Sequence, residues 1–387
     1  MQMVDWRSRL IHPTGRAPEG FRSLATPTFR GSTTILRSAA DVADHWDASQ
    51  APYRYGFYGT PTTLELAARI AELEGGAHCF ITPGGQAAIA LVYLSFVDAG
   101  GHVLVPDSVY GPSRDLATRL LSRMDIDAEY YDPAIGSGIE ALCRDHTQLI
   151  WCESPGSVTM EIQDIPAITQ VARERRIVSA LDNTYSAGVL FDAFSHGIDV
   201  TMQALTKYIG GHSDLLLGSV TVRDRELYLR IGDVHQLLGM SASPDDCSLA
   251  LRGLQTLAVR LDQLEKSTVE IARFLSAQPE IEQVMHPALP SSPGHQLWKR
   301  DFKGSASVFS VLFRENVSRE SIIRFIDRLK LFKLGFSWGG VTSLVMRYEE
   351  LSRVPPVPAT RIVRFNVGLE ATADLIADLA SAWEAFR

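Results

Sequence analysis

The sequence has 387 residues, of which 45% are hydrophobic and 21% charged, as in ordinary globular proteins. The formal net charge of −8 argues against nucleic acid or an anionic membrane as the main partner. The cysteines form no CxxC pair, and no apolar stretch is long enough to span a bilayer. We therefore expect a cytoplasmic protein of two or three domains with reduced cysteines.

Residues 1–57 are rich in proline, glycine and serine and include one short predicted helix at 39–46. Apolar side chains such as Leu24, Phe29 and Ile35 favour burial. We therefore expect an N-terminal arm that contributes to a neighbouring subunit, with a disordered tail as the alternative.

Residues 58–246 alternate short apolar runs with helical patterns. Thr60 is a candidate helix N-cap, Pro61 fits the first helical position, and Gly75-Gly76 ends that helix. Alternation of this kind predicts βαβ units in a mostly parallel sheet, which binds its ligands at the carboxyl ends of the strands. The predicted strands are 78–82, 102–106, 148–153, 177–182 and 200–205, and the helices between them are 86–97, 112–124 and 166–175.

Residues 247–387 have a different pattern and predict a smaller α+β C-terminal domain. A long helix is expected at 248–277, strands at 281–285, 307–313 and 362–367, and a closing helix at 371–386.

Lys207 is the most informative residue, because it follows an apolar run that ends a predicted buried strand. Burial disfavours the ammonium and lowers its pKa, and a neutral amine is a nucleophile that can form a Schiff base. Taken alone, a lysine whose head reaches the surface is the more common arrangement.

Two further sites follow neighbouring strands. Asp182 ends a predicted buried strand, where its carboxylate needs a cationic or hydrogen-bonding partner. Gly84, Gly85 and Gln86 lie in a turn before a helix, and their backbone N–H groups suit a phosphate. A GxGxxG fingerprint is absent. A buried lysine, a carboxylate and a phosphate cradle at successive strand ends match the needs of pyridoxal 5′-phosphate (PLP).

The sequence resembles the Cys/Met-metabolism family of fold-type I PLP-dependent enzymes, and within it the cystathionine β-lyases, over nearly the whole chain. The resemblance implies the PLP-dependent transferase-like fold of aspartate aminotransferase, an α/β fold with a large mostly parallel-sheet domain. The motifs that carry it are Ala17–Phe21, Arg30–Thr33, Glu153–Glu161, Leu181–Phe191, Thr206–Asp214, His286–Pro290, Gly335–Gly340 and Arg364–Glu370.

The resemblance also implies roles for individual residues. Lys207 would form the Schiff base and shuttle protons, and Asp182 would pair with the pyridine nitrogen. Tyr110 would stack on the ring and is a candidate auxiliary acid or base. Arg364 would bind the substrate carboxylate as a bidentate fork. The remaining implied contacts are Gly85, Gln86 and Thr206 on the phosphate, Ser337 and Trp338 beside the substrate, and Tyr55 from a neighbouring subunit.

Three positions depart from the family pattern. Phe57 stands where the family usually has an arginine that contacts the phosphate across the subunit interface, and Tyr58 follows it. Arg30 and Arg54 are candidates to replace that charge. Gln203 is expected to replace a phosphate-binding serine.

The expected reaction is β-elimination, which cleaves L-cystathionine or a related cysteine S-conjugate to a thiol, pyruvate and ammonia. The alternatives are another PLP-dependent reaction of the family, such as a γ-synthase or γ-lyase, and a catalytically inactive PLP-fold binding protein. A metal hydrolase is disfavoured because the sequence has no HExxH or HxH pair. A homo-oligomer of at least two chains is expected because Tyr55 would act across an interface, and the resemblance implies a dimer of dimers.

Overall fold

The computed structural model describes residues 5–11, 24–42, 45–47 and 53–386 of the chain. The motif at residues 17–21 lies outside these described residues, as does part of the helix expected at 39–46. Within that helix, the described residues form only a 3-10 turn, Ala39–Asp41, so the prediction of an α-helix there is wrong for this part.

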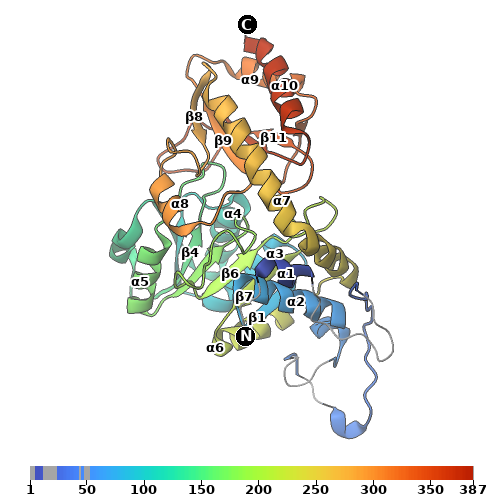
Figure 1. Cartoon of the computed structure of the whole chain (residues 1–387). Helices are drawn as coiled ribbons and strands as arrows, with labels where there is room; N and C mark the ends of the chain where they lie inside the picture. The colour runs from blue at the N-terminus through green and yellow to red at the C-terminus, as the bar shows by residue number, and fades with distance from the viewer. Residues whose placement is uncertain (1–4, 12–23, 43–44, 48–52, 387) are drawn as a thin grey trace.

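The larger part of the molecule contains a seven-stranded sheet (Figure 1). Its strands are β1 (His78–Thr82), β2 (His102–Pro106), β3 (Asp127–Tyr131), β4 (Thr147–Glu153), β5 (Val178–Asp182), β6 (Val200–Gln203) and β7 (Gly218–Val222). The spatial order is β1-β7-β6-β5-β4-β2-β3. Only β7 runs antiparallel to its neighbours, so the prediction of a mostly parallel sheet is confirmed.

Helices cover both faces of this sheet because its strands are apolar on both sides. Val103 and Val105 of β2 pack with one layer of helices, whereas Leu104 packs with the other. The first layer is α3 (Gly85–Phe96), α4 (Gly111–Arg119) and α6 (Arg225–Leu237), and the second is α2 (Pro61–Glu74), α5 (Ile165–Arg175) and α7 (Pro244–Ser276). The result is an α/β/α sandwich in which the helices leave the carboxyl ends of the strands uncovered.

The helix limits follow local capping. The Thr60 side chain accepts a hydrogen bond from Thr63 N at 3.4 Å, Pro61 opens α2, and Gly75 ends it in the left-handed region, as the sequence predicts. The helix expected at 112–124 is shorter than predicted. It ends at Arg119, and a separate 3-10 turn covers Leu121–Met124.

A five-stranded sheet forms the upper part of Figure 1. Its strands are β8 (Ile281–Met285), β9 (Val308–Phe313), β10 (Lys333–Leu334), β11 (Leu344–Arg347) and β12 (Ile362–Asn366), in the order β10-β11-β12-β9-β8. Its apolar core includes Phe309, Val363 and Phe365 and is covered by α9 (Arg319–Arg328), α10 (Thr372–Ala382) and the end of α7. The expected closing helix is α-helical only to Ala382 and then continues as a 3-10 turn.

Helix α7 has 33 residues and runs from one sheet to the other (Figure 1). It packs against α2 at one end and against β8 and α10 at the other. The expected boundary between residues 246 and 247 therefore falls inside this helix. Two shorter helices complete the described part of the chain: α1 (Trp6–Ile11), which packs against α7, and α8 (His295–Asp301).

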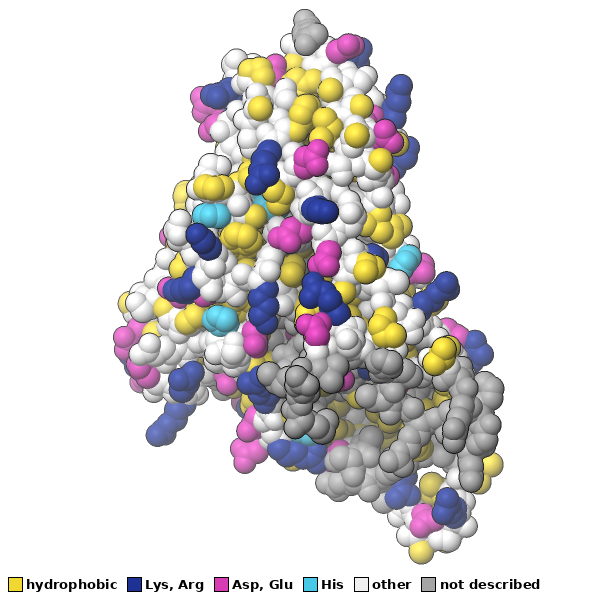
Figure 2. Space-filling view, in the orientation of Figure 1, with side chains coloured by type: hydrophobic (Ala, Val, Ile, Leu, Met, Phe, Trp, Pro, Cys, Tyr) yellow, Lys and Arg dark blue, Asp and Glu magenta, His cyan; other side chains and the backbone are white. Residues whose placement is uncertain are grey.

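On the face shown in Figure 2, basic and acidic side chains of the described residues are interspersed rather than gathered by sign. Among the helices of the described ranges, none combines the length and apolarity that a membrane span requires.

Candidate active site

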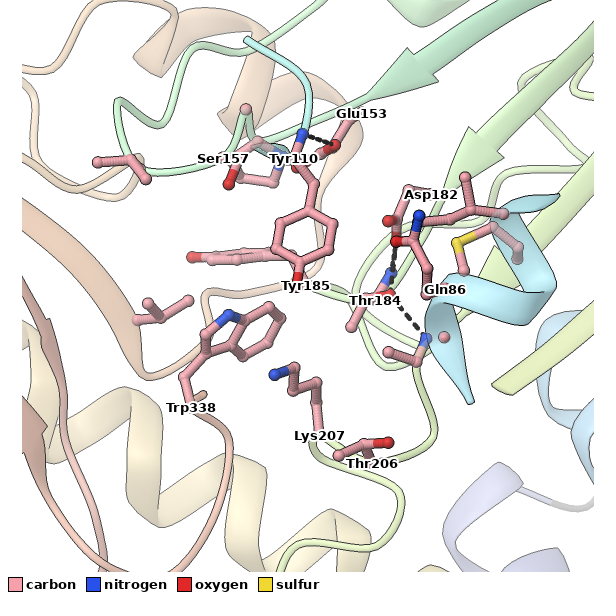
Figure 3. A pocket seen from close by; sticks show the side chains of 18 of the residues that line it. Gln86, Tyr110, Glu153, Ser157, Asp182, Thr184, Tyr185, Thr206, Lys207 and Trp338 are labelled. Carbon is pink, nitrogen blue, oxygen red and sulfur yellow. Dashed lines mark hydrogen bonds between the residues drawn. The ribbon is translucent and has the colours of Figure 1, made fainter. Parts of the chain in front are cut away.

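The main cavity lies at the carboxyl ends of the large sheet and has a volume of about 340 Å³ (Figure 3). Both sheets contribute to its wall, because Val308, Trp338 and Arg364 come from the C-terminal part of the chain. The residues with chemistry that line it are Gly85, Gln86, Tyr110, Glu153, Ser157, Asp182, Thr184, Tyr185, Thr206, Lys207, Trp338 and Arg364. The geometry therefore brings most of the predicted site residues together.

Lys207 reaches this cavity from a turn rather than from the end of a strand, because β6 already ends at Gln203. Its Nζ donates a hydrogen bond to Ser337 Oγ at 2.7 Å and lies 5.1 Å from the centre of the Trp338 ring (Figure 3). Burial, with the positive charge of Arg364, lowers the pKa of the Lys207 amine to about 8, against the pull of Asp182. The share of neutral, nucleophilic amine near neutral pH is therefore far larger than for an ordinary lysine.

Asp182 is the last residue of β5, as predicted, and is held by Thr184. Its Oδ1 accepts hydrogen bonds from Thr184 N at 3.0 Å and from Thr184 Oγ1 at 2.5 Å. Thr184 Oγ1 in turn accepts from Ala204 N at 2.9 Å, which fixes the hydroxyl proton toward Asp182. Burial raises the pKa of Asp182, and the Thr184 bonds and the Lys207 charge oppose that rise. The role of Thr184 was not predicted, although its place two residues after Asp182 permits such a turn.

Glu153 is a second buried carboxyl in the cavity, and the sequence analysis assigned it no role. It ends β4 directly opposite Asp182 in the strand register. Its Oε2 accepts a hydrogen bond from Tyr110 N at 2.8 Å, which fixes the start of α4 (Figure 3). Burial and the Asp182 charge raise the pKa of Glu153 well above its ordinary value. The motif that contains Glu153 was its one sequence signal.

The phosphate cradle is the N-terminus of α3, which begins at Gly85. The first N–H groups of a helix have no partner within it, so those of Gly85 and Gln86 are available to an anion. A Cβ on Gly85 would lie 2.6 Å from the Ala204 Cβ, so only glycine allows this close approach. The Thr206 hydroxyl, expected to join the cradle, donates to Leu217 O at 3.1 Å in this structure.

Gln203 does not face the cavity. The expectation that it replaces a phosphate-binding serine is therefore wrong. Its side chain is buried beside Glu74 and Gly188, on the other side of the strand. Ala204 occupies the adjacent position on the cavity wall. Successive side chains of a strand alternate between faces, which accounts for the shift by one residue.

Arg364 and Ser337 lie together at the mouth of the cavity. Arg364 occupies the middle of β12, and its Nη2 donates to Ser337 O at 3.0 Å. Ser337 has a φ of 75°, in the left-handed region that few non-glycine residues adopt. A substrate carboxylate at Arg364 would therefore lie close to the Lys207 amine.

Tyr55 lies outside this cavity in its own chain. Its side chain is exposed, and its ring packs 6.4 Å from the Phe57 ring and 6.1 Å from the Tyr58 ring. Phe57 and Tyr58 line a separate, smaller hollow. Among the described residues that line the main cavity, Lys207 and Arg364 are the cations.

The residues of the cavity fit PLP. This cofactor needs an amine for its aldehyde, an acidic partner for its ring nitrogen and a site for its phosphate. Lys207, Asp182 and the Gly84–Gln86 turn supply these groups around one space, and a Cβ on Gly84 would meet no atom within 4 Å, so the helix end is open to an anion.

Comparisons with known proteins agree with this fit. The family described as Cys/Met metabolism PLP-dependent enzyme matches residues 7–384. Cystathionine beta-lyase of Haemophilus influenzae is 37% identical over 98% of this chain and 98% of its own length. Cystathionine beta-lyase of Bordetella avium is 40% identical over 96% of each chain. The crystal structure of cystathionine gamma synthase from Xanthomonas oryzae, in complex with aminoacrylate and cysteine, superposes with a TM-score of 0.90 at 27% identity and covers 99% of this chain and 98% of that one. The chain therefore belongs to the Cys/Met metabolism PLP-dependent enzyme family.

Proposed function

We propose that this protein is a carbon–sulfur β-lyase that cleaves L-cystathionine, or a related cysteine S-conjugate, to a thiol, pyruvate and ammonia. The proposal rests on one observation. The Lys207 amine has a lowered pKa and shares a single cavity with Asp182 and Arg364. The names of the two β-lyase relatives support the choice of reaction.

PLP, when bound, supplies an electron sink for the charge that develops at the substrate Cα. Asp182 holds a proton at the ring nitrogen, and the Gly85 and Gln86 N–H groups, with the Thr206 hydroxyl after rotation, bind the phosphate. Arg364 binds the substrate α-carboxylate as a fork. These contacts fix the substrate before any bond changes.

Lys207 then acts as the general base that removes the Cα proton. Ser337 Oγ, 2.7 Å from Nζ, orients that amine, and the centre of the Trp338 ring lies 5.1 Å from it. Tyr110, which lines the same cavity, is the candidate to give or take a proton at the leaving sulfur. Tyr55 would complete the site from a neighbouring subunit.

A γ-synthase or γ-lyase is the second candidate, because it would use the same Lys207, Asp182 and Arg364. The similarity to a cystathionine gamma synthase structure favours keeping it. The keto acid released from L-cystathionine separates the two, since β-cleavage gives pyruvate and γ-cleavage gives 2-oxobutyrate.

The test is a steady-state assay of the PLP-loaded protein with L-cystathionine, cystine and O-acyl-homoserines, with identification of the keto acid. Lys207→Ala is expected to abolish pyruvate release and keep the circular dichroism of the folded protein. Lys299→Ala, which changes an exposed lysine, is the matched control. Retained turnover in Lys207→Ala would remove Lys207 as the base, and a purified protein without visible cofactor absorption would favour a non-catalytic binding protein.

We also infer a homo-oligomer, a dimer or a dimer of dimers, with residues 1–57 as an arm, 58–246 as the PLP-binding domain and 247–387 as the C-terminal domain. Leu24 and Ile35, exposed by 92% and 93%, support an arm that packs on another copy. Light scattering of the purified protein tests this assembly. A cytoplasmic location is proposed with it, in keeping with the four free cysteines.

A further inference from the structure

Behind the cavity, a chain of hydrogen bonds joins the turn that carries Lys207 to the loop that carries Ser337. Tyr208 directly follows Lys207, and its hydroxyl oxygen lies 2.9 Å from Ser307 Oγ and accepts from Ser307 N at 2.9 Å. Ser307 Oγ donates to Asn366 Oδ1 at 2.9 Å. The same Asn366 oxygen accepts from Gly339 N at 2.8 Å.

The hydroxyl groups of Tyr208 and Ser307 donate in one direction, toward Asn366. The Ser307 hydroxyl gives its proton to Asn366, so the bond between the two hydroxyls must use the Tyr208 proton. Tyr208, Ser307 and Asn366 are exposed by 1%, 0% and 1%, so water cannot replace a lost partner at the surface of any of them. A buried polar group without a partner is costly, which makes the chain a stiff connection.

The last residue of this hydrogen-bond chain, Asn366, holds the loop of Ser337 and Gly339, which packs closely against Lys207. Gly339 has a φ of 83°, and a Cβ there would lie 3.1 Å from Tyr208 N and 3.2 Å from the Lys207 Cβ. The Trp338 ring lies 5.4 Å from the Tyr208 ring. Asn366 Nδ2 also donates to Thr342 O at 3.1 Å, so one side chain fixes the loop at two points.

We propose that Tyr208, Ser307 and Asn366 are positioning residues that hold the Ser337 hydroxyl at the Lys207 amine. The 2.7 Å bond between Lys207 and Ser337 lies at the open cavity, where water competes with it. The buried chain sets the same two segments in place from behind, through residues next to Lys207 and two positions from Ser337. Tyr208 belongs to the large-sheet part and Asn366 to β12, so the chain also joins the two parts of the molecule.

Hydrogen exchange of the PLP-loaded protein tests the placement of the loop. Tyr208→Phe and Ser307→Ala each remove one hydroxyl of the chain. We expect about tenfold faster exchange of the amides in residues 335–343 in both variants, because Gly339 N–H bonds directly to Asn366. Ser310→Ala is the matched control, since that buried hydroxyl on β9 has no hydrogen-bond partner among the described residues, and it should leave this exchange unchanged. Unchanged exchange in both test variants would overturn the proposal, and either variant suffices if the other does not fold.

Kinetics test whether the effect passes through Ser337, and this arm rests on the proposed β-lyase function. Tyr208→Phe should lower kcat/KM for pyruvate release about tenfold, as expected for one buried hydrogen bond. In a Ser337→Ala background the same change should have little further effect, because the bond that it positions is already gone. A full additional tenfold loss in that background would show a merely structural role and overturn the proposal. If the unaltered protein releases no pyruvate, the proposed function fails while the exchange result still decides the positioning role.

Discussion

Glu153→Gln tests whether the two buried carboxyls of the cavity are ionised together. Glu153 and Asp182 end neighbouring strands in register, and burial and the Asp182 charge raise the pKa of Glu153 well above the usual 4.5, against the Tyr110 N–H bond and the Arg353 charge. Glutamine keeps an oxygen that can accept from Tyr110 N, so the 2.8 Å bond survives the change. The variant therefore removes the ionisable carboxyl of residue 153 and keeps its hydrogen bond to Tyr110.

The raised pKa of Glu153 decides whether the free energy of unfolding rises or falls with pH. The folded protein binds the Glu153 proton more tightly than the unfolded chain does. The contribution of this proton to the free energy of unfolding is fully present below the ordinary pKa of a glutamate. It is lost as pH rises through the raised pKa of the folded protein. Between these two values, the free energy of unfolding of the unaltered protein falls relative to Glu153→Gln by about 1.4 kcal/mol for each pH unit.

Calorimetry over a pH series measures this slope as a difference in Tm between the two proteins. With an unfolding entropy of about 2.1 cal/mol/K for each residue of a 387-residue chain, one pH unit corresponds to about 2 °C. Glu161→Gln is the control for the loss of a nearby charge, because its carboxylate bonds to Thr159 in the same loop at 2.7 Å. A constant Tm difference between about pH 5 and about pH 8 would refute the raised pKa of Glu153.

Three further predictions concern cofactor binding. Thr184→Val removes the hydroxyl bonded to Asp182 and should raise the PLP dissociation constant about tenfold, whereas Thr184→Ser should restore it; an equal constant in all three proteins would contradict this role. The rate of PLP uptake by the cofactor-free protein, followed by visible absorption, should rise with pH around a midpoint of about 8, because the Lys207 amine is neutral above its lowered pKa; a midpoint near 10.5 would mean an unshifted amine. Phe57→Arg should tighten PLP binding if this segment reaches the phosphate of a neighbouring subunit, and an unchanged or weaker constant would show that other groups already neutralise it.

Local patterns predicted much of the large sheet. Strands β1 and β2 coincide with the expected residues 78–82 and 102–106, because short apolar runs there are bounded by glycine or proline turns. The strand expected at 200–205 stops at Gln203, since Ala204 N bonds to the Thr184 side chain instead of a neighbouring strand. The residues of that bond are separated by 20 positions, so a local pattern could not place the end of the strand.

Long-range pairing accounts for part of what the sequence analysis missed. Strand β7 pairs with β1, whose residues lie far earlier in the chain, and its five residues carry only a short pattern. Helix α9 was also missed, although Ile322, Phe325 and Ile326 have helical spacing. The Ser307–Asn366 bond joins residues 59 positions apart. The strand-end pattern indicated Lys207, Asp182 and the Gly84–Gln86 turn, and the resemblance added Tyr110, Arg364, Ser337 and Trp338. The Thr184 bond to Asp182 and the hydrogen bonds behind Lys207 emerged only from the folded arrangement.

Helix α7 has a mechanical consequence for the molecule. At about 1.5 Å for each of its 33 residues, it is a rod of about 50 Å that is embedded in the cores of both sheets. A hinge between the sheets would have to bend this rod or strip one end of it from its packing. Thermal denaturation of the C-terminal sheet should therefore melt the shared helix and expose the large sheet in the same cooperative event.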